Sequence, residues 1–175
     1  NAEKKAGCIL LNIGAETISA VVFDNGIAIS MKVFRIGSSD ITKDIALGLR
    51  VSLEEAEALK LGAVVGSQHS KKKLDDIISA RLTDIFEVID GHLKKLGKNR
   101  LLPAGVILSG GGSHLSSAKS SAEASLKLHT KVAYVKSPHE EKSRDSSWSV
   151  AYGLTLWGMT TGRRAPGGSI KATDI

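Results

Sequence analysis

The apolar positions of the chain change their spacing twice, which divides it into strands, then helices, then alternating strands and helices. Residues 8–13 and 18–23 are short apolar runs, and residues 27–36 alternate in part between apolar and polar side chains. These patterns predict three strands. The Asp-Asn-Gly turn at 24–26 tolerates positive φ, so the strands are expected to form an antiparallel meander.

Helical spacing begins near residue 39. Asp40 precedes a segment whose apolar residues recur every three to four positions, and it is a suitable N-cap. Ser52 and Glu55 have the spacing of a capping box, which predicts a second helix from 53 that stops at Gly62.

A long helix is predicted over 74–96, because its apolar residues share one face, and we assign that face to the core. Gly97 is the expected terminator of this helix. Before it, residues 62–73 form an irregular insert with a short strand candidate at 64–65. The lysines at 71–73 are followed at once by two aspartates, so we interpret them as a solvated loop.

The stretch 102–115 is the centre of the predicted fold. A buried strand at 106–108 is followed by Gly110, Gly111 and Gly112, which have no Cβ and allow backbone to approach a flat ligand. A helix is predicted over 116–128, and its first N–H groups, which have no partner within the helix, would lie beside these glycines. Strand, glycines and helix outline a nucleotide pocket, but taken alone the glycines are better explained by a plain tight turn.

The remaining elements complete a mixed sheet. A strand is predicted at 131–135 and a final helix at 147–159, with Val150, Leu154 and Trp157 on one side, before a polar tail. Later strands that arrive through helices, added to a three-stranded meander, predict an α/β fold with a five-stranded sheet. The helical region near 45–97 is expected to be a small inserted subdomain.

Composition excludes several classes of function. The chain has 175 residues, 42% hydrophobic and only 4% aromatic, which predicts one ordinary aliphatic core. A single cysteine, Cys8, rules out internal disulfides. The net charge of +6 is scattered and lacks interleaved aromatic residues, so no nucleic-acid partner is expected. The histidines lack metal-ligand spacing, and Ser113-His114 lacks an oriented triad, so neither a metal site nor a catalytic serine is predicted.

Five segments resemble the second half of the bacterial cell-division protein FtsA family, in order and spacing, over about residues 7–160. The stretch from 40 to 60 is the most diagnostic, because actin-like folds in general do not require its detail. The segments are 11–17, 40–50, 52–60, 80–87 and 101–115.

The resemblance implies one half of an actin-like, ribonuclease H-like ATPase whose two lobes close on ATP and which tethers FtsZ filaments to the membrane. Residues 1–44 and 101–162 would be the larger subdomain of the second lobe. Residues 45–100 would be the smaller one, which faces FtsZ, and 163–175 a flexible tail. The first lobe and a membrane-anchoring helix are expected to be absent, as in an excised piece or a shortened relative.

The resemblance also assigns nucleotide-binding residues. Gly110, Gly111 and Gly112 match the adenosine loop, and Glu57 and Lys60 match the pair that holds the ribose and adenine edges. A spacing of three puts that pair on one helix face. Without the family, it would be interpreted as a plain surface ion pair.

The second phosphate loop supplies Asn12, Gly14 and Thr17 but departs from the family pattern Asp-Ile-Gly-Gly-Gly-Thr-Thr. Asn12 lacks the charge that places magnesium, and two glycines are replaced by Ala15 and Glu16. A carboxylate about 4 Å from a γ-phosphate would cost about 1–4 kcal/mol. We therefore expect weakened binding of ATP with Mg²⁺, slow or absent hydrolysis, and no catalytic residue.

Three functions follow. The favoured one is a cytoplasmic FtsA-like adaptor at the inner face of the membrane at the division site, which binds FtsZ, or a neighbouring copy in an actin-like filament, through residues 45–100. The second is a competent ATPase that needs the first lobe. The third is a pilus-assembly actin-like relative or a sugar kinase. A kinase needs an acidic catalytic base, and Asp40 and Asp44 are the only obvious candidates for one, although the helix pattern explains them as a cap and a surface residue.

Overall fold

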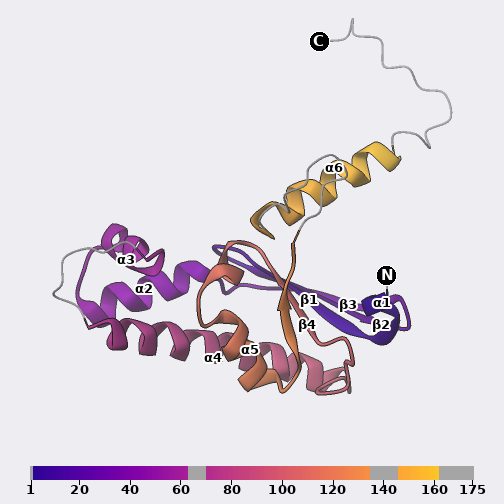
Figure 1. Ribbon diagram of the computed structural model, residues 1–175, viewed down its shortest axis with the longest axis horizontal. Coiled ribbons are helices and arrows are strands. Elements are labelled where there is room, and N and C mark those ends of the chain that lie inside the picture. The colour runs from indigo at the N-terminus through magenta and orange to yellow at the C-terminus, as the bar shows by residue number, and fades with distance from the viewer. Residues whose placement is uncertain (1, 63–69, 135–145, 162–175) are drawn as a thin grey trace, which may run out of the picture.

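The computed structural model describes residues 2–62, 70–134 and 146–161, which build a sheet with helices packed against one face (Figure 1). The first part of the chain is α1 (Ala2–Ala6), β1 (Cys8–Ile13), β2 (Ile18–Asp24), β3 (Ile27–Phe34), α2 (Ser38–Leu49) and α3 (Leu53–Lys60). The second part is α4 (Lys71–Lys95), β4 (Val106–Ser109), the 3₁₀ turn η1 (Gly111–His114), α5 (Ala118–Leu126), β5 (Thr130–Val132), the 3₁₀ turn η2 (Ser146–Trp148) and α6 (Ser149–Thr161).

The sheet has the predicted mixed topology. Its strand order is β3-β2-β1-β4-β5, with β1, β2 and β3 antiparallel and with β4 parallel to both β1 and β5. The turn between β2 and β3 places Asn25 and Gly26 at φ of 50° and 82°, the left-handed conformation that this sequence favours. The expectation of a meander joined to crossover strands is confirmed.

The core lies between one face of the sheet and α2, α4 and α5. Alternate residues of β1, among them Ile9 and Leu11, are fully buried, and α4 contributes Leu82 and Phe86 to the same cluster. Phe86 is an aromatic exception in a core of aliphatic side chains. The apolar stripe of the long helix is therefore core, as predicted.

The start of α2 differs from the prediction. Asp40 is not the N-cap, because the helix begins at Ser38 with Gly37 as its cap. The Asp40 carboxylate instead accepts a hydrogen bond from the Gly37 N–H at 3.0 Å, as the third-position partner of a capping box does. This backbone hydrogen bond lowers the pKa of Asp40 despite its partial burial. The Ser52 cap is confirmed, since its hydroxyl accepts from the Glu55 N–H at 3.2 Å.

The long helix also begins earlier than predicted. It starts at Lys71, so the three lysines form its exposed first turn rather than a loop. Its end is as predicted: Gly97 has φ of +65°, its N–H donates to the Lys94 carbonyl at 3.0 Å, and the Lys98 N–H donates to the Leu93 carbonyl at 2.9 Å. These two bonds are a Schellman motif.

The last third shows two corrections. A 3₁₀ turn, η1, follows Gly110, and α5 starts only at Ala118, so no α-helical N-terminus opens directly beside the glycines. The apolar residues predicted on one side of the last helix, Val150, Leu154 and Trp157, are exposed by 52, 62 and 67%. The predicted strand at 64–65 and the tail 163–175 lie outside the described residues.

Gly37 and Gly91 provide a matched test of how tightly α2 approaches the loop after β1. A Cβ at Gly37 would lie 2.2 Å from the Ala15 carbonyl oxygen, whereas one at Gly91 on α4 would meet nothing within 4 Å. Gly37→Ala should lower the free energy of unfolding by about 2 kcal/mol. Gly91→Ala should raise it by about 0.5–1 kcal/mol. Urea unfolding measures both, and a Gly37→Ala variant as stable as the parent would contradict the close approach.

Candidate nucleotide site

The loop after β1 is held by the first turn of α2. The Ser38 N–H donates to the Gly14 carbonyl at 2.9 Å, and the Ser39 N–H donates to the Ala15 carbonyl at 2.8 Å. Within the loop, the Gly14 N–H donates to the Thr17 carbonyl at 2.9 Å. The first N–H groups of α2 therefore satisfy this loop, while Ala15, Glu16 and Thr17 stay exposed.

The three glycines after β4 have different roles. A Cβ at Gly110, which has φ of +84°, would lie 2.5 Å from the Ile13 carbonyl oxygen, and one at Gly112 would lie 2.3 Å from the Ile13 Cγ2. These two glycines are explained by their contact with the end of β1. A Cβ at Gly111 would meet nothing within 4 Å, and this residue is exposed. Gly111 is therefore the glycine whose backbone a ligand can approach.

Asn12 lies beside this contact. Its side-chain oxygen accepts a hydrogen bond from the Ser109 hydroxyl at 3.4 Å, and a Cβ at Gly110 would lie 2.7 Å from the same oxygen. The ends of β1 and β4 are thus joined by side chain as well as by the parallel ladder. Ligands of open α/β sheets bind at the carboxyl ends of parallel strands, where Asn12 and Ser109 lie.

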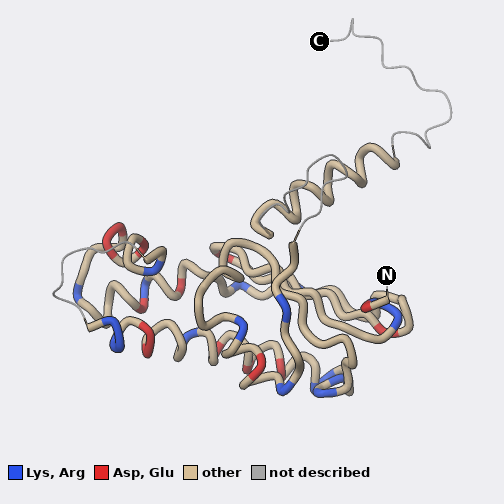
Figure 2. Tube along the Cα trace, viewed as in Figure 1, with Lys and Arg blue, Asp and Glu red and all other residues tan. Residues whose placement is uncertain are grey.

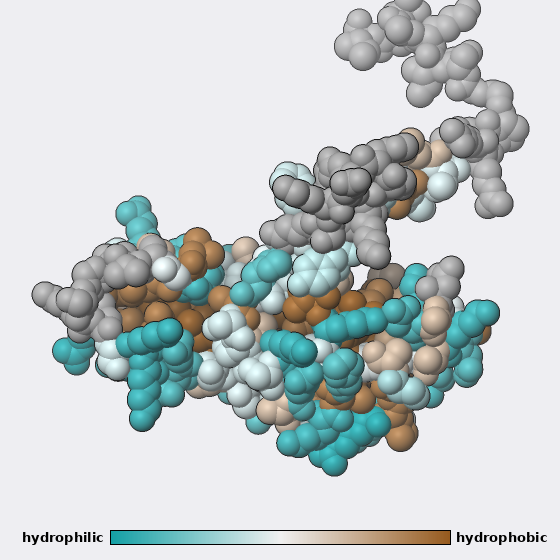
Figure 3. Space-filling model, viewed as in Figure 1, coloured by the Kyte–Doolittle hydropathy of each residue, from teal (hydrophilic) through white to brown (hydrophobic). Residues whose placement is uncertain are grey.

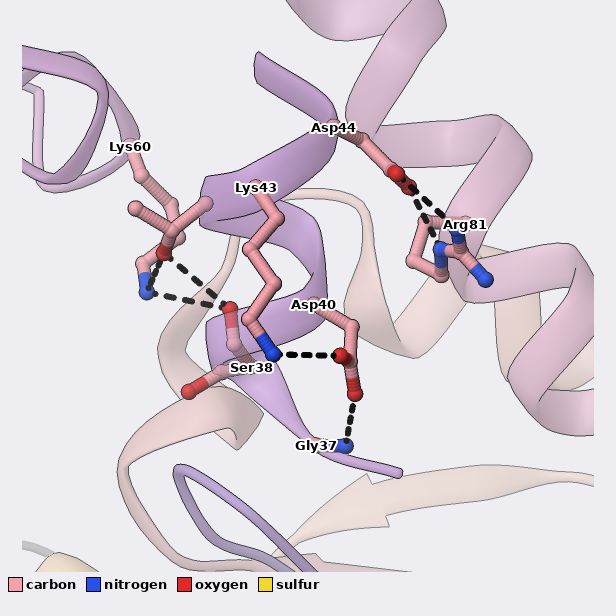
Figure 4. Close-up of polar contacts among 8 residues, drawn as sticks. Gly37, Ser38, Asp40, Lys43, Asp44, Lys60 and Arg81 are labelled. Atoms are coloured by element: carbon pink, nitrogen blue, oxygen red, sulfur yellow. Dashed lines mark hydrogen bonds and ion pairs between the residues drawn. The ribbon is translucent and has the colours of Figure 1, made fainter. Parts of the chain in front are cut away.

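Glu57 and Lys60 of α3 form a polar cluster with the start of α2. Figure 4 shows the Lys60 side chain directed toward Ser38. The Lys60 ammonium donates to the Ser38 carbonyl at 3.2 Å and to the Thr42 hydroxyl at 2.9 Å, and it lies 2.7 Å from the Glu57 carboxylate. The Thr42 hydroxyl donates to Glu57 at 2.5 Å. Burial raises the pKa of Glu57, but the hydrogen bonds from Lys60 and Thr42 and the Lys60 charge outweigh burial and lower this pKa.

The two members of the pair differ in access. The Lys60 side chain is 5% exposed and the Glu57 side chain 45% exposed. Lys60 therefore joins α3 to the first turn of α2, and Glu57 is the member that a ligand can reach. This arrangement is more than a surface ion pair, because it contains a buried ammonium with three protein partners.

The cluster and the phosphate loop share Ser38. The Ser38 carbonyl accepts a hydrogen bond from Lys60, and the Ser38 N–H donates to the Gly14 carbonyl. Gly14 directly follows Ile13, the last residue of β1, against which Gly110 packs. The start of α2 and Gly110 thus meet the end of β1 through backbone contacts, and the Lys60 side chain joins α3 to the same start of α2. A surface hollow of about 650 Å³ lies elsewhere, between α4 and α5, and includes none of the predicted nucleotide residues; it is lined by Thr83, Glu87, Asp90, Gly91, Lys94, Arg100, Ala124 and Ser125.

Sequence reasoning missed Thr42 and Ser38. Thr42 is a hydroxyl residue, 7% exposed, next to the fully buried Ile41. A polar side chain inside the apolar stripe of α2 was the available signal, because buried hydroxyls need hydrogen-bond partners. Ser38 acts only through its backbone, and sequence carries no signal for that contact.

Asp40 and Asp44 are both engaged in structural contacts. Asp40 lies 3.1 Å from the Lys43 ammonium, in addition to its bond with Gly37. Asp44 accepts two hydrogen bonds from Arg81 of α4, at 2.5 and 2.8 Å, which join the helices by a bidentate pair (Figure 4). These contacts account for both carboxylates without a role as a catalytic base.

The charge of Glu16 also affects the Lys43 ammonium. Its pKa is raised mainly by the hydrogen bond and charge of Asp40, with a further contribution from the charge of Glu16. The Glu16 carboxylate, in the exposed loop at the end of β1, therefore lies close enough to α2 for its charge to affect Lys43.

Comparison with known proteins identifies the family of this chain. A family model described as "Cell division protein FtsA" matches residues 9–153. The chain belongs to the FtsA family. It is 31% identical to the cell division protein FtsA of Bacillus subtilis (strain 168) over 92% of this chain and 40% of that protein. It is also 31% identical to FtsA of Neisseria meningitidis serogroup B over 87% of this chain and 42% of that protein.

Solved structures show the fold. The PilM-PilN type IV pilus biogenesis complex matches with a TM-score of 0.72 at 23% identity, over 90% of this chain and 47% of that chain. MreB5 of Spiroplasma citri bound to ADP matches with a TM-score of 0.71 at 16% identity, over 96% of this chain and 58% of that chain. The actin-like fold predicted from the family resemblance is confirmed, and the chain spans about 40% of the length of its curated FtsA relatives.

No helix within the described ranges 2–62, 70–134 and 146–161 has the length and hydropathy needed to cross a membrane. No group of three or more His, Cys, Asp or Glu residues there is placed to hold a metal ion.

The Glu57 cluster predicts a specific pH dependence of stability. Because folding lowers the pKa of Glu57, the carboxylate stabilises the fold above its unfolded pKa of about 4.5. That contribution is lost as pH falls through the lowered folded pKa. The stability difference between the parent and Glu57→Gln, measured by urea unfolding, should therefore be largest near pH 7 and shrink below about pH 4.5.

The control is Glu54→Gln, which changes an exposed carboxylate on the first turn of the same helix. Its difference from the parent should vary less with pH. If the difference for Glu57→Gln stayed constant from pH 7 to pH 3, the cluster would not contribute to stability through the Glu57 charge.

Proposed function

We propose that this chain is the second lobe of an FtsA-like adaptor that links FtsZ filaments to the division machinery at the inner face of the cell membrane. Family membership carries the assignment to cell division. The observation that favours an adaptor over an efficient ATPase is the loop at the end of β1. Its exposed residues include Glu16 where the family pattern has glycine, and Asn12 stands where it has Asp.

The adenosine side of the site is better preserved than the phosphate side. Gly111 offers open backbone, and Glu57 has a partly exposed carboxylate paired with Lys60, whose ammonium donates to the Ser38 carbonyl. A carboxylate can accept hydrogen bonds from ribose hydroxyls. On the phosphate side, Gly14 and Thr17 keep their backbone bond, but the charge of Glu16 would oppose a γ-phosphate. We therefore infer weak binding of ATP with Mg²⁺ and slow hydrolysis.

Residues 45–100 are the proposed FtsZ-facing surface. Two of the most exposed apolar side chains of the described residues lie here, Leu47 on α2 at 81% and Leu61 after α3 at 74% exposure. Contiguous exposed apolar patches mark interaction surfaces, and we propose that Leu47 and Leu61 contribute to such a patch. The same surface could receive a second copy in an actin-like filament, which the test below separates from FtsZ binding.

The alternative is a competent actin-like ATPase whose activity needs the first lobe. The MreB5 relative was solved bound to ADP, which supports nucleotide binding by the fold in that protein. The likeness to PilM at 23% identity supports the fold alone and does not favour a pilus role over cell division.

The phosphate loop decides between these functions. In a two-lobed protein that carries this lobe, isothermal titration should show weak binding of Mg-ATP. The double change Asn12→Asp and Glu16→Gly should strengthen that binding about tenfold or more, since it restores a magnesium-placing charge and removes a repulsive one. Glu54→Gln, which removes an exposed carboxylate outside this loop as Glu16→Gly does within it, is the control and should leave the affinity unchanged. Micromolar affinity for Mg-ATP and measurable turnover in the parent would contradict the proposal that the protein is an adaptor without ATPase activity.

The FtsZ surface is tested by point changes, because α4 supplies fully buried residues to the core and deletion of 45–100 would unfold the lobe. Leu47→Asp with Leu61→Asp should reduce co-sedimentation with FtsZ filaments about tenfold or more. Leu101→Asp, a change at a 65% exposed apolar residue outside this region, should pellet like the parent. If the parent, the double variant and Leu101→Asp all pelleted equally with FtsZ, Leu47 and Leu61 would not belong to an FtsZ-binding surface. Pelleting of the parent without FtsZ would indicate self-association instead.

A further inference from the structure

The start of α2, which lies against the loop after β1, has no free hydrogen-bond donor for a phosphate. The first N–H groups of a helix commonly bind anions, because they lack partners within the helix. In α2 each of them has a partner. The Ser38 and Ser39 N–H groups donate to two carbonyls of the loop, at 2.9 and 2.8 Å. The Gly37 N–H donates to the Asp40 carboxylate at 3.0 Å, and the Asp40 N–H donates to the Gly37 carbonyl at 3.2 Å.

The basic side chains of α2 and α3 beside this loop are also engaged. The Lys60 side chain is 5% exposed and has three protein partners, and the Lys43 ammonium lies 3.1 Å from the Asp40 carboxylate. Arg35 is exposed and follows the end of β3, which pairs with the start of β2 directly after the loop. The charges of these segments cancel: Arg35, Lys43 and Lys60 stand against Glu16, Asp40 and Glu57.

The positive charge of the whole chain does not compensate for this balance. The chain has a net charge of +6, but Figure 2 shows acidic and basic residues interspersed along α2, α3 and α4. Figure 3 shows hydrophilic side chains in separate groups, with apolar side chains exposed between them. Exposed charges act over about 8 Å at physiological salt. Distant lysines therefore attract a phosphate at the end of β1 only weakly.

The loop itself keeps the remaining donors and carries a charge against their use. The N–H groups of residues 15–17 have no hydrogen-bond partner within the described ranges, and all three residues are exposed. Glu16 is the middle one of the three. Its carboxylate forms no ion pair in the described part of the chain, although its charge reaches Lys43. A phosphate that approaches these N–H groups meets an uncompensated carboxylate.

The adenosine side of the site makes no comparable demand for positive charge. Gly111 has open space where a Cβ would lie, so its backbone is accessible. The Glu57 carboxylate is 45% exposed and is held in place by Lys60 and Thr42. Such a carboxylate can accept hydrogen bonds from sugar hydroxyls. Adenosine offers these hydroxyls without charge, whereas each added phosphate brings negative charge.

We propose that this site prefers an adenine nucleoside with few or no phosphates over ATP, and that Glu16 is the residue that sets this preference. The inference rests on the adenosine site of the proposed function and goes beyond weak ATP binding, because it names the ligand that binds better. The required effect is modest, since a tenfold preference needs no more than the repulsion of one close charge pair at a protein surface.

Titration of the 175-residue chain by nuclear magnetic resonance tests this preference. The backbone amide signals of Gly111 and Lys60 are the reporters. The dissociation constant should rise from adenosine through AMP and ADP to ATP with Mg²⁺, by about tenfold or more over the series. Binding of ATP that is as tight as that of adenosine, or tighter, would overturn the inference.

A matched pair of variants assigns the preference to one side chain. Glu16→Gln removes the charge with little change in side-chain size. It should lower the dissociation constant of ATP about fivefold or more and leave that of adenosine unchanged. Glu54→Gln, at an exposed carboxylate of α3, should change neither value. An unchanged ATP affinity in Glu16→Gln would contradict the role of Glu16.

Ionic strength separates charge repulsion from a steric effect of the loop. Raising the salt concentration from about 0.05 to 0.5 M screens exposed charges. The ratio of the ATP to the adenosine dissociation constant should therefore fall in the parent and change less in Glu16→Gln. A salt-independent ratio in the parent would overturn a preference based on charge.

The same titration distinguishes the two levels of inference. If adenosine left the Gly111 amide signal unmoved, the adenosine site of the proposed function would be wrong, and this inference with it. If adenosine moved that signal and ATP bound equally well, only the preference would be wrong.

Discussion

The close contact of three backbone segments at the carboxyl end of β1 is the constraint on which the rest of the structure depends. Gly110 and Gly112 pack against Ile13, and Gly37 brings the start of α2 against the carbonyl of Ala15. A Cβ at any of these glycines would overlap its neighbour. This contact fixes β4 beside β1, and it fixes α2 at the end of the same strand. The position of every proposed binding residue follows from these two placements.

The same contact explains why the glycines are ambiguous as a nucleotide signature. Two of the three after β4 are required by packing alone, so their presence does not by itself demand a ligand. Gly111 has no packing requirement and lies at the surface. The ligand hypothesis therefore rests on one glycine together with Glu57.

Polar contacts hold α3 and α4 against α2 as a rigid unit. Lys60 joins α3 to α2 through the Ser38 carbonyl and the Thr42 hydroxyl, and Arg81 joins α4 to α2 through a bidentate pair with Asp44. Both contacts are part-buried, where ion pairs depend on complete hydrogen bonding. Helices held together in this way can present an outer surface to a partner without rearranging. Such rigidity is an advantage for an adaptor, since less entropy is lost on binding.

The sequence by itself determined the order and type of the elements, because their periodicity, caps and turns are local properties. The Asp-Asn-Gly turn, the Ser52 cap and the Gly97 terminator were all predicted from adjacent residues, and the order of the elements predicted the mixed sheet. The positions that differed, Asp40 as a cap and Lys71–Lys73 as a loop, are element boundaries, where several local signals compete. What only the tertiary structure decided was which partners distant residues find. The Thr42 hydroxyl between Glu57 and Lys60, the packing reason for Gly37, and the exposure of α6 all depend on contacts between segments far apart in the chain. A single sequence records the residues that make such contacts but not their distances.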